Sequence, residues 1–108
     1  MAKPAYLVVF ITTSGHEEAR KIADALVSQR KAACVNIVPR VNSLFRWKGK
    51  IEDAEESLLV VKTRAKLFSD VVSTVKSIHS YEVPEIIALP IVEGNPDYLK
   101  WIDEETGK

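Results

Sequence analysis

Cys34 and His79 are the two side chains of this sequence best suited to bind a transition metal. A cysteine thiolate is a soft ligand that favours Cu(I), and a histidine imidazole binds Cu or Zn. A closed zinc site needs about four ligands, so one chain offers half a site at most. The sequence therefore predicts weak binding of copper or another divalent metal, and folding that requires no metal.

Both residues also have purely structural interpretations. Cys34 stands between Ala33 and Val35, and a free cysteine in an apolar stretch is commonly a small buried hydrophobic residue. His79 follows a predicted helix, whose last carbonyls an imidazole can cap. A thiol enzyme using Cys34 with His79 is disfavoured, because a reactive thiol needs an exposed, electropositive setting.

A second group of candidates is polar and aromatic. We expect these residues to line a ligand cleft or a subunit interface: Trp47, Glu56, Lys62, Tyr81 and Glu85. The alternative is that the polar ones form hydrogen bonds and ion pairs across the interface, with Trp47 as an apolar anchor.

Other acidic and histidine residues are weaker candidates for metal ligands. Asp53, Glu55 and Glu56 lack the spacing of a calcium loop and fit a solvated strand face, and we expect His16 in solvent. The sequence has no glycine-rich phosphate loop, CxxC pair, HExxH helix or GxSxG elbow, so we expect no catalysis.

Composition narrows the class of protein. The 108 residues fit a single domain over residues 1–108. Fifteen basic residues balance fifteen acidic ones, which argues against a nucleic-acid partner. The longest apolar run is too short to span a membrane, no signal peptide is visible, and one cysteine suits a reducing compartment, so we expect a cytoplasmic protein.

The elements that position these residues follow from periodicity. We expect strands over 5–12, 33–47, 51–63 and 86–92, helices over 14–31 and 68–78, and a short helix after Asn95 and Pro96. Residues 5–12 form a continuous run rich in β-branched and aromatic residues, which predicts a central strand buried on both faces. The order βαββαβα predicts an α+β, ferredoxin-like sandwich with a long projecting hairpin and a short C-terminal helix.

Local signals refine these boundaries. Ser14 and Glu17 have the spacing of a capping box, and Asn95 is placed to cap the last helix. Pro39 predicts a bulge or an edge position, and Pro90 predicts an edge strand.

The central hairpin is longer than the core requires. Each arm is roughly 14 residues, or about 45 Å long, whereas a domain of this size has a radius of gyration of about 13 Å. The projecting part carries Leu44, Phe45, Trp47 and Ile51, which would stay exposed in a monomer. We therefore expect a homo-oligomer.

Several segments together resemble the divalent-cation tolerance protein family, CutA. They are Ala32–Pro39, Ser43–Lys50, Lys62–Thr63, His79–Glu85 and Tyr98–Trp101. The resemblance implies a ferredoxin-like protomer in a homotrimer similar to PII signalling proteins, a link to copper or divalent-metal tolerance, and no established catalysis. A structural or adaptor trimer that acts through protein contacts is the alternative.

The resemblance carries over a described copper site only in part. That site uses a cysteine at the end of the first strand and two adjacent histidines after the second long helix. Those positions here hold Ile11, and Ile78 with His79, so one of three ligands is present. Ser80 also replaces the proline of the family's usual His-Pro-Tyr.

Overall fold

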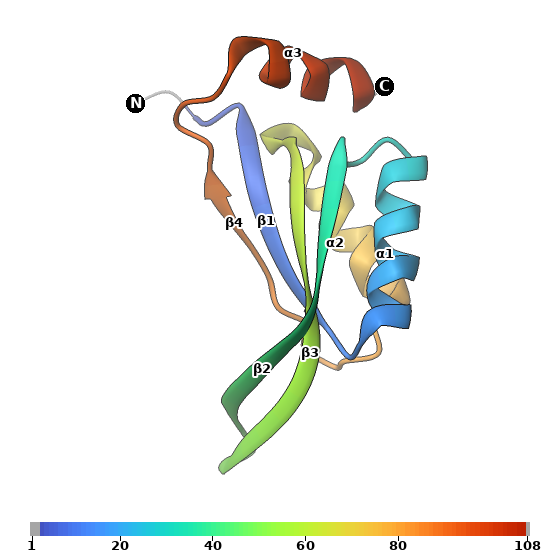
Figure 1. Cartoon of the computed structure of the whole chain (residues 1–108), viewed down its shortest axis with the longest axis vertical. Helices are drawn as coiled ribbons and strands as arrows, with labels where there is room; N and C mark the ends of the chain where they lie inside the picture. Colours follow the sequence, from blue (N-terminus) through green and yellow to red (C-terminus); the bar gives the residue numbers. More distant parts are fainter. Residues whose placement is uncertain (1–2, 108) are drawn as a thin grey trace.

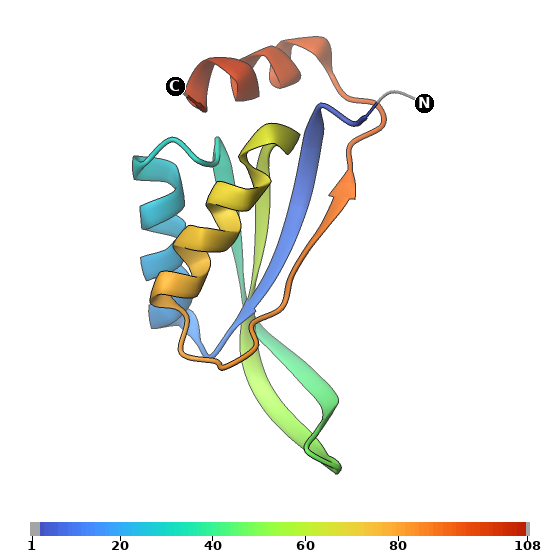
Figure 2. The same ribbon diagram turned by 180° about the vertical axis from the view of Figure 1, so that it is seen from behind.

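The computed structural model describes residues 3–107, which form a four-stranded antiparallel sheet, three α-helices and a 3-10 turn. The elements in chain order are β1 (Tyr6–Thr13), α1 (His16–Ser28), β2 (Cys34–Trp47), β3 (Lys50–Arg64), the 3-10 turn (Ala65–Leu67), α2 (Phe68–Ile78), β4 (Ile86–Pro90) and α3 (Pro96–Glu105). The strand order is β2-β3-β1-β4, and Figure 2 shows α1 and α2 lying across one face of the sheet. The predicted ferredoxin-like α+β fold is confirmed.

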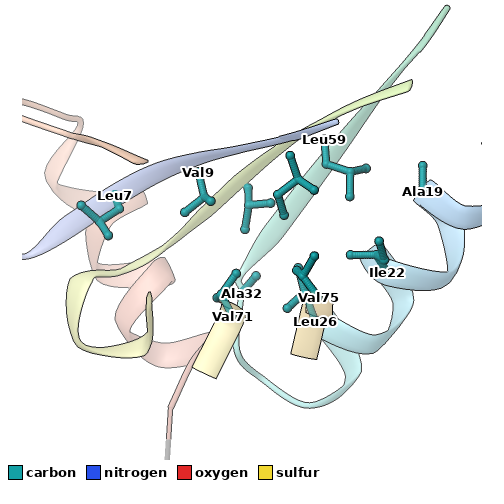
Figure 3. Close-up of a cluster of buried hydrophobic side chains, with 11 residues drawn as sticks. Leu7, Val9, Ala19, Ile22, Leu26, Ala32, Leu59, Val71 and Val75 are labelled. Carbon is teal, nitrogen blue, oxygen red and sulfur yellow. The ribbon is translucent and has the colours of Figure 1, made fainter. Parts of the chain in front are cut away.

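The core lies between the sheet and these two helices (Figure 3). One face of β1 and β3 contributes aliphatic side chains, and the facing sides of α1 and α2 contribute the rest. The fully buried members are Val9, Ile11, Ala19, Ile22, Leu26, Leu59, Val61, Val71 and Val75. Branched aliphatic residues at strand period two and helix period 3.6 thus meet in one layer.

The prediction that the first strand is buried on both faces is wrong. In β1 the buried residues alternate with half-buried ones, because α1 and α2 cover only one face of the sheet. Val8 and Phe10 lie on this open face, in register with Leu89 and Ile87 of β4. Leu89 and Ile87 are 56% and 54% exposed, so the open face is apolar and uncovered within one chain.

The start of α1 differs from the predicted capping box. Gly15 occupies the N-cap position, and no side chain caps the helix. The carboxylate that reaches back belongs to Glu18, which accepts the Ser14 N–H at 2.9 Å. The helix also ends at Ser28 rather than near Lys31, and Arg30 takes a left-handed conformation with φ 59°.

The long hairpin has two parts that meet at the predicted bulge. The register between β2 and β3 shifts between Val38 and Val41, and Arg40 has φ 69°. β1 pairs with β3 only as far as Ser57, so residues 41–56 extend beyond the sheet as a two-stranded ribbon (Figure 1). The turn at Lys48 and Gly49 has two positive φ angles, 51° and 81°, as a tight hairpin turn requires.

The C-terminal elements agree with most of the local signals. β4 is an edge strand, as Pro90 predicted, although it ends at Pro90 rather than at residue 92. The Asn95 side chain caps α3 by accepting the Asp97 N–H at 3.0 Å. α3 lies across the end of the sheet opposite the hairpin tip (Figure 1). No helix within residues 3–107 is long and apolar enough to cross a membrane.

Candidate functional site

A cleft of about 1000 Å³ opens where the projecting ribbon meets the segment between α2 and β4. Its walls are Thr12, residues 42–45, Trp47, Glu52, Ala54, Glu56, residues 80–83 and Glu85. Four of the predicted cleft residues, Trp47, Glu56, Tyr81 and Glu85, therefore lie together. The fifth, Lys62, lies elsewhere on the sheet.

Glu56 and Tyr81 form the buried end of this cleft. The Tyr81 hydroxyl donates to Glu56 Oε2 at 2.7 Å, and the Glu56 residue is only 5% exposed. Burial, and then the hydrogen bond to Glu56, raise the pKa of Tyr81 well above its usual value. Tyr81 therefore stays protonated at neutral pH and acts as the donor of this pair.

His79 anchors the segment that carries Tyr81. Its ring is fully buried; Nε2 donates to the Thr12 carbonyl at 2.7 Å, and Nδ1 accepts the Tyr81 N–H at 3.1 Å. These partners fit the neutral tautomer with the proton on Nε2. Since both ring nitrogens have protein partners, metal binding by His79 would require one of these bonds to break.

Glu18 of α1 completes the anchor. Its carboxylate accepts the N–H groups of Ser14 and Ser80, at 2.9 and 2.7 Å, and lies 3.7 Å from His79 Nδ1. Burial raises the pKa of Glu18, but the hydrogen bonds from Ser14 and Ser80 outweigh it, and the net pKa is lowered. The carboxylate thus ties the start of α1 to the segment that bounds the cleft.

Cys34 lies at the other end of the sheet, on the open face. It is half-buried and in register with Lys62, whose Nζ lies 3.9 Å from Sγ. Lys62 also donates to the Asn36 side chain. The Tyr98 hydroxyl of α3 lies beside the thiol, and burial together with this neighbour raises the pKa of Tyr98.

Cys34 and His79 do not share a site within one chain. Cys34 is aligned with Val8 of β1 through Lys62, whereas His79 contacts Thr12. Four residues of strand separate these points, or about 13 Å at ~3.3 Å per residue. Within residues 3–107 no three His, Cys, Asp or Glu side chains are grouped to hold a metal ion.

The remaining candidates, Asp53, Glu55 and His16, are exposed on the protein surface. Asp53 accepts from the Asn42 amide at 3.1 Å, and Glu55 pairs with Arg40 at 3.2 Å. Exposed His16 borders a second, smaller hollow of about 450 Å³ at the start of α1. Within the described part of the chain, none of these side chains belongs to a group of three or more His, Cys, Asp or Glu residues that could hold a metal ion.

Sequence reasoning missed several residues of the site. Phe45, Glu52 and Glu82 also line the cleft. Each lies within four residues of a predicted cleft residue in the sequence, and this proximity could have indicated them. Glu18 gave no such signal, because its contact with Ser80 spans 62 residues and depends on how α1 packs.

Comparison with known proteins places the chain in a family. The model for "CutA1 divalent ion tolerance protein" matches residues 7–105. The divalent-cation tolerance protein CutA of Thermus thermophilus is 53% identical over 100 residues, which cover 93% of this chain and 97% of that protein.

Two solved structures agree in fold. CutA1 from Oryza sativa superposes with a TM-score of 0.94 at 41% identity, covering 97% of this chain and 96% of that one. The Archaeoglobus fulgidus protein, described as a periplasmic divalent cation tolerance protein, gives a TM-score of 0.90 at 45% identity, covering 93% and 97%. None of these names describes a catalysed reaction, and the chain belongs to the CutA1 divalent ion tolerance family.

Proposed function

We propose that this protein acts as a non-catalytic, PII-like homotrimer in the response to divalent metal ions, copper among them. The observation that carries the oligomer is the apolar surface that one chain leaves open. Leu44 and Ile51 of the ribbon are 69% and 67% exposed, and Ile87 and Leu89 are more than half exposed on the open sheet face. Burial of such surface between copies is the ordinary way to remove it from water.

Light scattering on the purified chain tests this assembly. A mass of three protomers at micromolar concentration is expected, and a monomer at that concentration contradicts the proposal.

The proposed partners are further copies of the chain and a metal ion or small ligand, with neither nucleic acid nor membrane. We place the protein in the cytoplasm, although the Archaeoglobus relative is described as periplasmic.

Metal binding is proposed to be weak, with Cys34 and His79 as its ligands. The two side chains lie too far apart within one chain to share an ion, and His79 already has two partners. A tight site would need ligands from more than one subunit. A trimer brings such ligands together only near its axis or at a cleft shared by two subunits. No resident cofactor is proposed.

The metal proposal is tested by elemental analysis of protein purified without chelator. Substoichiometric Cu or Zn is expected, and Cys34→Ala and His79→Ala should each reduce it. His16→Ala is the matched control, because His16 is exposed and should leave metal content unchanged. If metal is absent while the trimer persists, the adaptor function is favoured instead.

A further inference from the structure

The ribbon of residues 41–56 leaves the sheet at a β-bulge. Two residues of β2, Pro39 and Arg40, stand there opposite a single residue of β3. Figures 1 and 2 both show β2 and β3 crossing over one another where the ribbon leaves the sheet, which is the strong local twist that a bulge produces. We propose that this bulge turns the ribbon face that carries Phe45 and Trp47 toward another copy of the chain, an inference that rests on the proposed assembly of copies.

The extra residue also changes which side chains share a face. Val35 and Ile37, before the bulge, pack against the core beneath the helices. Unbroken alternation would place Phe45 and Trp47 on that same side, because both lie an even number of residues further along β2. The bulge shifts the alternation by one residue, so both aromatic side chains lie instead on the side of Leu58, which is the open face of the sheet.

The core of one chain does not require the bulge. Within residues 3–107 the hydrophobic core reaches only as far as Ile37 on β2 and Leu59 on β3, and it includes no residue of the ribbon. Arg40 nonetheless has φ 69°, a left-handed conformation that residues other than glycine rarely adopt. Its ion pair with Glu55 joins side chains that are 80% and 64% exposed, and such a pair contributes little. A strained residue that the packing of its own chain does not use indicates a role outside the protomer.

The charges of the ribbon identify a second copy as the partner. Residues 41–48 of β2 include Arg46 and Lys48 and no acidic residue, whereas residues 52–56 of β3 include four acidic residues and no basic one. The two arms are thus opposite in charge, and a surface of this kind is complementary to another copy of itself. Because β2 is an edge strand, its basic arm can reach the acidic arm of another copy.

Deletion of Arg40 tests the role of the bulge. The deletion leaves Pro39 alone opposite Ser57, so the two arms pair without a bulge and every side chain of the ribbon keeps its face. We expect the chain to fold, and sedimentation on dilution to show that the trimer dissociates at a concentration about tenfold higher than the wild type does. Arg40→Gly is the matched control. It removes the same side chain but keeps the extra residue, in a conformation that glycine readily adopts, and should assemble like the wild type.

A second variant removes the bulge from the opposite strand. Insertion of one serine between Glu56 and Ser57 gives Arg40 a partner in β3, so the arms again pair without a bulge. This change also turns the ribbon over and places Phe45 and Trp47 on the helix side. We expect a folded monomer, measured by circular dichroism and sedimentation. If deletion of Arg40 prevents folding, the insertion variant decides the question, and a trimer as tight as the wild type then contradicts the proposal.

Three outcomes beside a trimeric wild type overturn the role of the bulge alone. The deletion variant could assemble as tightly as Arg40→Gly, in which case the twist is not needed. Both variants could be weakened equally, in which case the Arg40 side chain is responsible. Neither the deletion nor the insertion variant could fold, in which case the protomer itself requires the bulge. A monomeric wild type is a different failure, because it contradicts the assembly of copies and this inference with it.

Discussion

The two faces of the sheet are built from the same kinds of residues, yet only one is covered within the chain. On the helix side, Leu59 and Val9 are completely buried beneath α1 and α2. On the open side, Leu58 and Phe10 occupy the neighbouring positions of the same strands and stay half-buried. The apolar pattern of a strand thus shows which residues need burial, but it does not show whether the same chain covers them.

Leu59→Ala should produce the largest effect, because it empties a fully buried site in the core. A loss of about 2–5 kcal/mol in the free energy of unfolding is expected, measured by urea denaturation. Leu58→Ala is the matched control, since it makes the same substitution one residue away on the open face. If Leu58→Ala destabilises an isolated, dilute chain as much as Leu59→Ala does, the distinction between the faces is lost.

Trp47→Ala tests the uncovered surface on the ribbon. Trp47 is 38% exposed in one chain, and cover by another copy would make it an anchor. We expect weaker assembly, by about 3–5 kcal/mol if the ring is fully buried there, measured by sedimentation on dilution. A trimer that melts within a degree or two of the wild type would show that Trp47 is no anchor.

The comparison also explains how far the sequence could be interpreted. Period-two and period-3.6 patterns, together with Pro39, Pro90 and Asn95, predicted the strands, the bulge, the edge and the cap, because these signals act locally. The first strand was misjudged because the run 5–12 has no pattern that tells a helix cover from an open face.

The candidate site was less predictable for the same reason. Trp47, Glu56, Tyr81 and Glu85 line one cleft of the chain, whereas Lys62 lies at the Cys34 end of the open face. Glu56 and Lys62 are six residues apart in β3, so alternation places both on the same face of the strand. The pairing of β3 with β1 ends at Ser57. Lys62 therefore lies within the sheet, whereas Glu56 lies beyond it, at the cleft.

Tyr81→Phe removes the hydrogen bond to Glu56 at the point where the ribbon leaves the sheet. The change leaves the buried Glu56 carboxylate without its donor, so the free energy of unfolding should fall by about 1–3 kcal/mol. Tyr6→Phe is the control, because its hydrogen bond to Asp103 is exposed. An equal, small effect of the two substitutions would mean that solvent replaces the Tyr81 hydroxyl at Glu56 and that the cleft floor is open to water.

The smallest expected effect concerns Glu18, which joins the covered side to the cleft. Its pKa is lower in the folded chain than its ordinary value of 4.5, so the folded state favours the carboxylate. The corresponding stability is present above the unfolded pKa and is lost as pH falls through the folded one. Glu18→Gln should therefore reduce stability at pH 7 and flatten its decline between about pH 5 and 3. Glu17→Gln, an exposed neighbour, should retain the wild-type slope, and thermal melting across this pH range distinguishes the two. Identical slopes in all three proteins would show that the bonds from Ser14 and Ser80 do not couple α1 to the cleft.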